Sequence, residues 1–258
     1  MIRLQKKGRV SMEMKIPKII HYCWLGNAEK PSDVENYIQK WRSILKDYKI
    51  MEWNEESFPF SEIECIYLQD AMKMKRWAFV TDYMRLYVLY KYGGIYLDTD
   101  IEMLKSFDDF LEYDSFIGLE SSYTLCTAVI GAKPKQRWLK DLLTEYDQRK
   151  FVDDTGKIDN KPNSQYIFEY LSAKENLKDS HTVQKLSNGL VVFPQEYFSP
   201  INYLTMKTNI TEQTYTIHHY NGTWKSERER RKDKILGLLT RIIGEKNRKR
   251  IKQIIKKE

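Results

Sequence analysis

The chain of 258 residues is long enough for one domain around a single hydrophobic core, and its 41% hydrophobic and 31% charged residues exclude an intrinsically disordered chain. The net charge of +7 is unevenly spread, because residues 226–258 hold 13 Lys and Arg against 5 Asp and Glu. Residues 1–225 then carry a net charge of −1, so the basic character belongs to the tail and says nothing about the body.

Three widely separated cysteines, Cys23, Cys65 and Cys126, show neither metal-ligand spacing nor a disulfide framework, which favours a reducing compartment. Residues 1–15 form an expected N-terminal extension whose basic residues precede no apolar run, unlike a secretory signal. No segment approaches the roughly 20 apolar residues that a membrane-spanning helix needs. We therefore expect a cytoplasmic protein.

The N-terminal third of the chain alternates strand and helix signals. Ile16–Leu25 is an apolar, β-branched run closed by Gly26, and it predicts a buried first strand. Pro31-Ser32-Asp33 opens a helix that continues to about Leu45. A short second strand is expected at Ile50–Trp53.

One long helix is predicted over Tyr67–Tyr92, with the Gly93-Gly94 pair as its stop signal. The short apolar strand Ile95–Leu97 follows and leads directly into Asp98-Thr99-Asp100. The remaining expected elements are strands at 115–119, 126–131, 190–193 and 215–220 and helices at 135–146 and 163–171. Alternating strands and helices predict an α/β fold with a mainly parallel sheet.

Two groups of charged residues are candidates for chemistry. Asp82 and Arg85 lie three residues apart on one helix face, which suits either an ordinary intrahelical ion pair or a ligand site. Asp98 and Asp100 follow a strand end, where ligands bind in α/β sheets, and together they can hold one hard divalent cation. Such a cation can bridge a diphosphate. A lone D-x-D is nevertheless frequent by chance, so the case depends on its context.

That context is specific. The run T-D-Y-M-R-L-Y-V-L-Y-K-Y-G-G-I-Y-L-D-T-D, Thr81–Asp100, closely resembles the signature of glycosyltransferase family 32, whose members carry a sugar-binding region containing DXD. The opening I-P-K-I-I-H-Y-C-W-L-G at 16–26 and the ending I-H-H-Y-N-G-T-W-K at 217–225 are also similar to that family. The family includes yeast initiating mannosyltransferases and bacterial capsule enzymes, and clostridial glucosylating toxins share its core pattern. The resemblance implies a GT-A-like, Rossmann-related catalytic domain over residues 16–225.

The resemblance also implies roles for single residues. Asp98 and Asp100 match the metal-binding pair, with Asp100 the more direct ligand of Mn²⁺ and with Mg²⁺ as the alternative ion. Asp82 and Arg85 match the acid and the arginine that hold the donor sugar and its phosphate side. The other positions matched to donor binding are Tyr96, which precedes the pair, Trp24, which can stack on the base or else cap the core, and the closing Trp224.

His218 and His219 lie on a predicted strand and therefore face opposite sides. In the family a histidine in this context lies near the metal or the diphosphate, and we choose His218. Two segments depart from the family pattern, since Leu125–Ala128 lacks an expected asparagine and Lys161–Ser164 replaces a Gly-Pro motif. We expect both segments toward the acceptor, whose identity the pattern leaves open.

The tail, residues 226–258, predicts two short basic amphipathic helices separated by Gly244. The apolar positions of the first helix are Ile235, Leu238, Leu239, Ile242 and Ile243, and those of the second are Ile251, Ile254 and Ile255. A solvated tail, helices packed on the body, and non-specific nucleic-acid binding are alternatives. We favour binding to an anionic membrane, because each basic residue near such a surface contributes on the order of 1 kcal/mol.

The resemblance implies a retaining transferase that moves a hexose from a nucleotide diphosphate sugar, with UDP-hexose favoured, to a hydroxyl of a glycan acceptor. A polyprenyl-diphosphate-linked acceptor, capsule or exopolysaccharide synthesis, and attachment to the inner face of the cell membrane complete the hypothesis. A toxin-like transferase that glycosylates a protein is the alternative enzyme. A basic nucleic-acid-binding protein is the alternative of another class. It predicts that residues 1–225 alone would retain little function.

Overall fold

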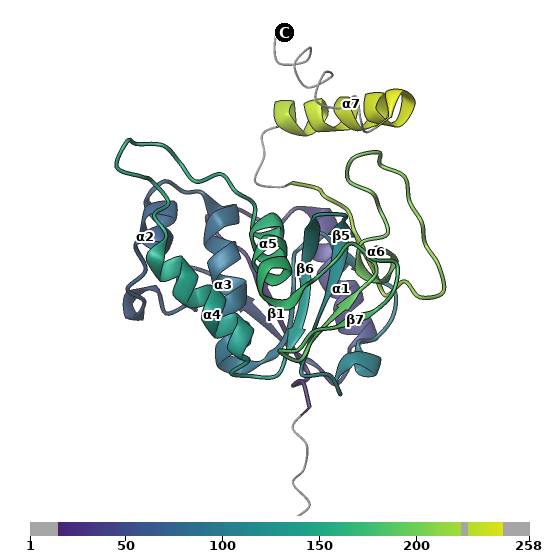
Figure 1. Cartoon of the computed structure of the whole chain (residues 1–258), viewed down its shortest axis with the longest axis horizontal. Coiled ribbons are helices and arrows are strands. Elements are labelled where there is room, and N and C mark those ends of the chain that lie inside the picture. Colours follow the sequence, from purple (N-terminus) through teal and green to yellow (C-terminus); the bar gives the residue numbers. More distant parts are fainter. Residues whose placement is uncertain (1–14, 223–226, 245–258) are drawn as a thin grey trace, which may run out of the picture.

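The computed structural model describes residues 15–222 and 227–244, and its centre is a seven-stranded sheet in the order β2-β1-β3-β6-β5-β8-β7 (Figure 1). The strands are β1 (Ile19–Cys23), β2 (Lys49–Trp53), β3 (Gly94–Leu97), β5 (Ser115–Ser121), β6 (Thr124–Ala132), β7 (Gln184–Lys185) and β8 (Leu190–Phe193). Five strands point the same way, while β6 and β7 run against them. The predicted α/β fold with a mainly parallel sheet is confirmed.

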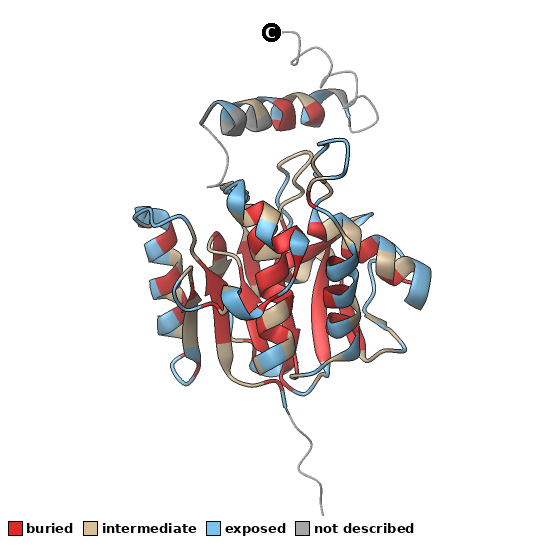
Figure 2. Ribbon diagram, turned by 90° about the vertical axis from the view of Figure 1, so that its left-hand side faces the viewer, coloured by how far each residue is buried: buried red, intermediate tan, exposed pale blue. Residues whose placement is uncertain are grey.

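Helices cover both faces of this sheet, as Figures 1 and 2 show. On one face lie α2 (Ile66–Lys73), α3 (Trp77–Tyr92), α4 (Arg137–Gln148) and α5 (Asn163–Glu175). On the other lie α1 (Ser32–Ile44), α6 (Gln195–Phe198) and a two-stranded sheet of β4 (Ile101–Met103) and β9 (Thr216–His218). Short 3₁₀ turns occur at Phe60–Glu62 and Asp108–Phe110.

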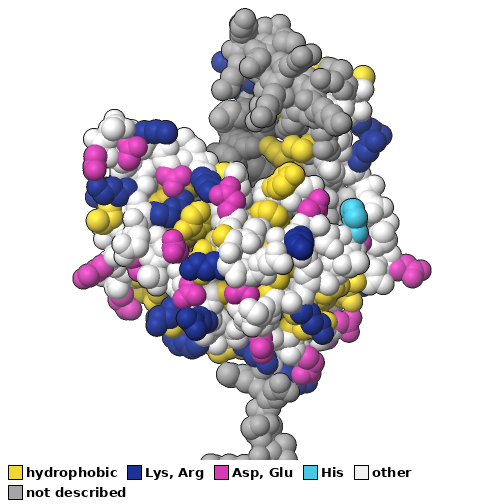
Figure 3. Space-filling model, in the orientation of Figure 1, with side chains coloured by type: hydrophobic (Ala, Val, Ile, Leu, Met, Phe, Trp, Pro, Cys, Tyr) yellow, Lys and Arg dark blue, Asp and Glu magenta, His cyan; other side chains and the backbone are white. Residues whose placement is uncertain are grey.

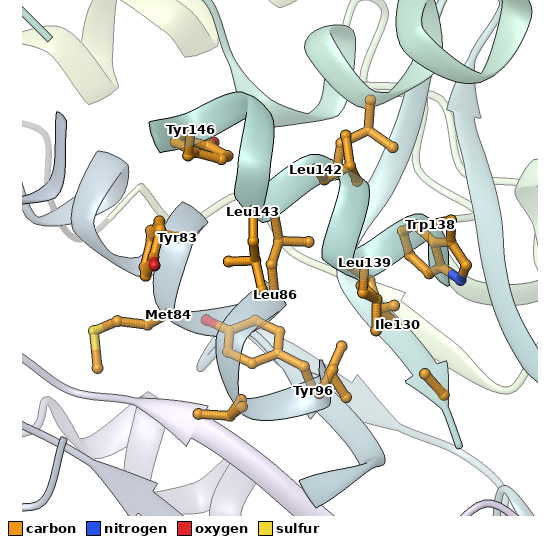
Figure 4. Packing of buried hydrophobic residues seen from close by; sticks show 14 of the residues in the cluster. Tyr83, Met84, Leu86, Tyr96, Ile130, Trp138, Leu139, Leu142, Leu143 and Tyr146 are labelled. Atoms are coloured by element: carbon orange, nitrogen blue, oxygen red, sulfur yellow. The ribbon is translucent and has the colours of Figure 1, made fainter. Parts of the chain in front are cut away.

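The two faces of the sheet carry separate hydrophobic clusters, because successive strand residues point to opposite sides. In β8, Leu190 and Val192 join the cluster under α3 and α4, whereas Val191 and Phe193 join the cluster on the α1 side. Figure 4 shows the first cluster, in which side chains of α3 and α4 meet Tyr96 and other residues of the sheet. Burial on both faces explains the continuous apolar runs of these strands.

The long helix predicted over residues 67–92 is wrong, because α2 ends at Lys73 and α3 begins at Trp77. Lys75 between them has a φ of 53°, a left-handed conformation that no α-helix continues through. The short strands β4 and β7 also carried no signal strong enough for prediction, because each has only two or three residues.

The stop signal at Gly93-Gly94 is confirmed, and it joins α3 directly to β3. Gly93 ends the helix with a φ of 65°, and a Cβ at Gly94 would lie 2.6 Å from the carbonyl oxygen of Ile19. Only glycine permits this combination of backbone conformation and close approach to β1. Because no loop separates α3 from β3, the charged residues of α3 and the acids after β3 are held on adjoining rigid elements.

Helix α7 (Glu227–Ile243) ends immediately before Gly244, whose φ is 83°, so the predicted break at this glycine is observed. Leu236 and Thr240 are buried on its inner side, where a Cβ at Gly237 would lie 2.9 Å from the Met206 side chain. The second predicted tail helix falls in 245–258, outside the described residues. Within the described part of the chain, no helix combines the length and apolar character needed to cross a membrane.

The outer side of α7 carries exposed apolar residues. Ile235, Leu238 and Ile242 are 52%, 57% and 82% exposed. These three side chains therefore do not pack on the body as core. The face of the body shown in Figure 3 differs from this apolar side of α7, because acidic and basic side chains are interspersed over it.

A fully buried histidine joins β1, β2 and the end of α3. His21 Nδ1 accepts a hydrogen bond of 3.0 Å from Trp53 Nε1, so Nε2 carries the proton and donates to the Gly93 carbonyl oxygen at 2.8 Å. Both ring nitrogens are satisfied in the neutral form. Burial lowers the pKa of His21 to about 4.

We predict that this histidine makes the fold sensitive to mild acid. In the unfolded chain this histidine takes up a proton below about pH 6.5, whereas in the folded protein it stays neutral down to about pH 4. Its contribution to stability is therefore complete above pH 6.5 and is lost as the pH falls from 6.5 to 4. Urea unfolding of the wild type should lose about 3 kcal/mol more over this interval than unfolding of a His21→Gln variant, which has no titrating ring. Equal pH dependence in both proteins would contradict the prediction.

Candidate active site

The candidate residues converge at the carboxyl edge of the sheet, from three elements. Helix α3 presents Asp82 and Arg85, and the chain that leaves β3 presents Asp98 and Asp100. The β4–β9 ladder pairs Ile101 with His218, which brings the histidine beside these acids across more than 100 residues of sequence. The rigid sheet, rather than a flexible loop, therefore sets the spacing of the site.

Arg85 is the link between α3 and the acids after β3. Its Nη2 lies 3.2 Å from Asp82 Oδ1 and 3.3 Å from Asp98 Oδ1, and its Nη1 donates to the Thr127 carbonyl oxygen at 2.6 Å. The guanidinium also lies 4.8 Å from the centre of the Tyr96 ring. Arg85 is 5% exposed, so the intrahelical pair with Asp82 exists but forms part of a larger buried network.

Asp98, Asp100 and His218 form a candidate metal centre, because each offers a ligand atom and these atoms lie within 4.8 Å of one another. His218 Nε2 is 3.4 Å from Asp100 Oδ1. Asp100 Oδ2 accepts a hydrogen bond of 2.9 Å from the backbone N–H of Asn221, which fixes the carboxylate plane. Carboxylate oxygens suit Mn²⁺ and Mg²⁺, and the imidazole favours a transition-metal ion such as Mn²⁺, so the donor set fits the expected cation.

The two adjacent histidines face opposite sides, as their strand position predicts. His218 reaches Asp100, whereas His219 Nε2 lies 2.9 Å from Glu102 Oε2. The His219 ring stacks on Tyr37 at 5.1 Å, away from the aspartate pair. Geometry thus brings His218, and not His219, to the candidate metal centre.

Burial and ion pairing shift the pKa values of these four groups in different directions. Burial raises the pKa of Asp82 to about 6, against the opposing pull of Arg85, and burial also raises the pKa of Asp98. Burial alone would raise the pKa of Asp100 and lower that of His218, but their mutual attraction outweighs it in both groups. The pKa of Asp100 therefore lies below its usual range and that of His218 well above it.

Residues 31–117 match the model of a family described as "Glycosyltransferase sugar-binding region containing DXD motif". The matched segment contains Asp82, Arg85 and the D-x-D pair, while the strand that carries His218 lies beyond it. Over this segment the chain is similar to the DXD-containing glycosyltransferases.

Known proteins similar to this glycosyltransferase have different origins. An uncharacterised glycosyltransferase, L373, of Acanthamoeba polyphaga mimivirus is 27% identical over 180 residues, which cover 57% of the chain and 72% of the viral protein. Mannosyl phosphorylinositol ceramide synthase SUR1 of Saccharomyces cerevisiae is 28% identical over 142 residues, and these cover 53% of the chain but 37% of the yeast enzyme. A solved glycosyltransferase involved in glycosylation of the PBCV-1 major capsid matches with a TM-score of 0.45 and 14% identity, over 85% of the chain and 98% of that structure.

The positions expected to bind the donor differ in their accessibility. Tyr96 is 1% exposed beneath Arg85, and its hydroxyl donates to Asp98 Oδ1 at 3.0 Å, so it contacts Asp98 directly, while its role in donor binding stays a prediction. Trp24 is half-buried just past the carboxyl end of β1, and its Nε1 donates to the Ala28 carbonyl oxygen at 2.7 Å. Trp224 falls in 223–226, outside the described residues.

Several residues near the site were missed by sequence reasoning. Glu120 Oε1 lies 3.3 Å from His218 Nδ1, and the side chain of Asn221 donates to Asp33 Oδ2 at 2.9 Å. Glu120 could have been noticed, because it follows the predicted strand 115–119 at the same carboxyl edge as the D-x-D. The segments that depart from the family pattern both contact α3. Thr127 accepts from Arg85, and the Asn163 side chain donates to the Asp82 carbonyl oxygen at 3.4 Å.

We predict that Arg85 is also a major contributor to stability. An Arg85→Met variant keeps a stem of similar volume but leaves Asp82 and Asp98 without their shared cation, so the free energy of unfolding should fall by about 3–5 kcal/mol. The matched control is Arg137→Met, since Arg137 makes only an exposed pair of 3.9 Å with Asp141 and should change stability by less than about 0.5 kcal/mol. Similar losses in the two variants by urea denaturation would contradict this account.

Proposed function

We propose that this glycosyltransferase is metal-dependent and retaining, and that it moves a hexose from a nucleotide diphosphate sugar, with UDP favoured, to a hydroxyl of a glycan acceptor. The observation that carries the proposal is the cluster of Asp98, Asp100 and His218, whose ligand atoms lie within 4.8 Å at the carboxyl edge of the sheet. An ordinary structural ion pair does not need three such ligands beside a further acid and arginine. In α/β folds this edge is where ligands bind.

The residues around the cluster have distinct proposed roles. Asp98, Asp100 and His218 would hold Mn²⁺ or Mg²⁺, and a bound cation supplies the positive charge that a diphosphate leaving group needs. Asp82 is only partly buried and accepts hydrogen bonds when ionised, which suits the hydroxyls of the donor sugar. The nitrogens of Arg85 contact Thr81, Asp82, Asp98 and Thr127, so we assign Arg85 first to holding the two acids in place and second to the phosphate side of the donor.

The proposed base site is the half-buried ring of Trp24, past the end of β1. Lys30 Nζ lies 5.9 Å from the centre of this ring, and Lys30 is paired with Glu52 at 2.9 Å. An aromatic ring with one accessible face suits stacking on a nucleobase. Proposed domain boundaries follow from these roles, with the catalytic domain at 16–225, an extension at 1–15 and a basic tail at 226–258.

A lipid-linked acceptor is the second part of the proposal. The yeast relative is named as a synthase of mannosyl phosphorylinositol ceramide, a lipid that carries a mannosyl group, so an acceptor carried by a lipid has a precedent among similar proteins. The exposed apolar residues of α7, together with basic residues of the same helix such as Arg228 and Arg241, suit the surface of an anionic membrane. Attachment there would raise the effective concentration of a polyprenyl-diphosphate-linked acceptor in capsule or exopolysaccharide synthesis.

We predict that metal dependence can be read directly from turnover. Asp98→Asn and Asp100→Asn should each reduce donor hydrolysis about 100-fold or more, since the cation is expected to supply several kcal/mol. EDTA should act likewise on the wild type, and Mn²⁺ should restore it. Asp154→Asn, at a side chain that is 88% exposed, is the control and should keep full activity.

The same assay identifies the donor. A panel of UDP- and GDP-sugars with Mn²⁺ should yield hydrolysis with one UDP-hexose above all others. Full activity in EDTA would refute the metal assignment, and preference for a GDP-sugar would refute the choice of base. No hydrolysis of any nucleotide sugar would refute the proposed function.

Membrane binding is predicted to depend on the outer side of α7. A triple variant, Ile235→Ser, Leu238→Ser and Ile242→Ser, should lose sedimentation with vesicles rich in anionic lipid, because it removes apolar contact but none of the charge. High salt should weaken binding of the wild type, which loses the electrostatic contribution. The control variant Ile66→Ser with Ile210→Ser alters other exposed apolar residues, at 58% and 55% exposure, and should bind normally. Binding that survives the triple substitution would disprove the role of α7.

A further inference from the structure

His218 makes a carboxylate contact with each of its two ring nitrogens. Nε2 points at Asp100 Oδ1 at 3.4 Å, and Nδ1 points at Glu120 Oε1 at 3.3 Å. The His218 side chain is 12% exposed and that of Glu120 is 16% exposed, so both contacts are largely shielded from water. Glu120 comes from the end of β5, an element that supplies none of the proposed metal ligands.

The two nitrogens cannot have the same role. A nitrogen that binds a metal must be without a proton, and the other nitrogen of the neutral ring then carries it. Since Nε2 faces the aspartate pair, the proton belongs on Nδ1, which can donate it to Glu120. Metal-binding histidines commonly donate their second N–H to a carboxylate, which fixes the tautomer and the ring orientation and makes the ligand nitrogen more basic.

We propose that Glu120 is the positioning residue of the metal centre, which it controls through His218 without binding the cation itself. The inference rests on the proposed metal dependence and assigns a role to a residue outside the D-x-D motif. Glu120 acts by accepting the Nδ1 proton and thereby holding Nε2 toward Asp98 and Asp100. Substrate contact by Glu120 is not required for this role.

The surroundings of the ring favour this arrangement over a second metal site. Glu120, Cys126 and His218 also lie within 4.8 Å of one another, but a cation there would have to use the nitrogen opposite the aspartate pair. Cys126 is fully buried, and thiol sulfur is a poor ligand for the hard cations that the aspartates suit. Tyr220 packs on the other side, with its ring 4.0 Å from that of His218 and its hydroxyl 2.7 Å from Ser199. Packing against Tyr220 therefore holds the His218 ring in the orientation in which Nδ1 faces Glu120.

The chain contains its own matched control. His219 and Glu102 form a similar imidazole–carboxylate pair at 2.9 Å, one residue further along, but they face Tyr37 and Lys40. Loss of that carboxylate perturbs the same segment without touching the ring of His218. A difference between the two pairs thus separates control of the metal from general support of the fold.

The test is a titration of the purified chain with Mn²⁺ alone, in which free ion is followed by electron paramagnetic resonance. Glu120→Met preserves volume but removes the acceptor, so it should raise the Kd for Mn²⁺ about 10–100-fold. Glu120→Gln keeps an acceptor but loses the charge, so its Kd should rise by at least about threefold. Glu102→Met should leave the Kd within about twofold of the wild type, and the thermal unfolding midpoint of every variant is measured in EDTA. Those midpoints identify any variant that binds poorly because it is unfolded.

Each other result has a defined meaning. Wild-type affinity in folded Glu120→Met, or an equal loss in Glu102→Met, would overturn the role of Glu120 while leaving the metal centre intact. Should Glu120→Met not fold, an unchanged Kd in Glu120→Gln would overturn it equally. Failure of the wild-type chain to bind Mn²⁺ would instead remove the metal dependence on which the inference stands.

Discussion

The structure depends on the need to bring several carboxylates together in one largely buried cluster. An unpaired buried carboxylate costs several kcal/mol, so a cluster of this kind can form only around opposing charges. Arg85 bridges the first two acids, and His218 bridges the other two. The acids are Asp82, Asp98, Asp100 and Glu120. Arg85 thus compensates the four acids only in part, and the remaining negative charge is what a divalent cation would neutralise.

The fold holds these charges on rigid elements. The glycine pair at 93–94 joins α3 to β3 without a loop, and the β4–β9 ladder carries His218 to the acids from the far end of the domain. Tyr96 and Asn221 then fix the two aspartates individually, through a hydroxyl and a backbone N–H. Such hydrogen bonds reduce the reorganisation needed when a ligand binds, which is the physical basis of preorganised catalysis.

The body and the tail divide two tasks between them. The body has nearly balanced charge and contains every described residue assigned to the chemistry of sugar transfer. Helix α7 approaches the body at Gly237, beside the Met206 side chain, and leaves Ile235, Leu238 and Ile242 exposed. In Figure 1 this helix lies at the top of the view, beyond one end of the body, so a surface bound by α7 would lie at that end.

The sequence by itself determined the α/β class, most strands, the helix stop at Gly93-Gly94, and the D-x-D with its neighbouring acid and arginine, because these signals lie within short windows of periodicity or motif. Only the tertiary structure decided that His218 rather than His219 meets Asp100, that Tyr96 supports the site from below, and that Glu120 contacts the histidine. The Glu120–His218 pair spans 98 residues, and the Asn221–Asp100 bond spans 121. Contacts over such separations follow from strand register and packing, which no local pattern of residues encodes.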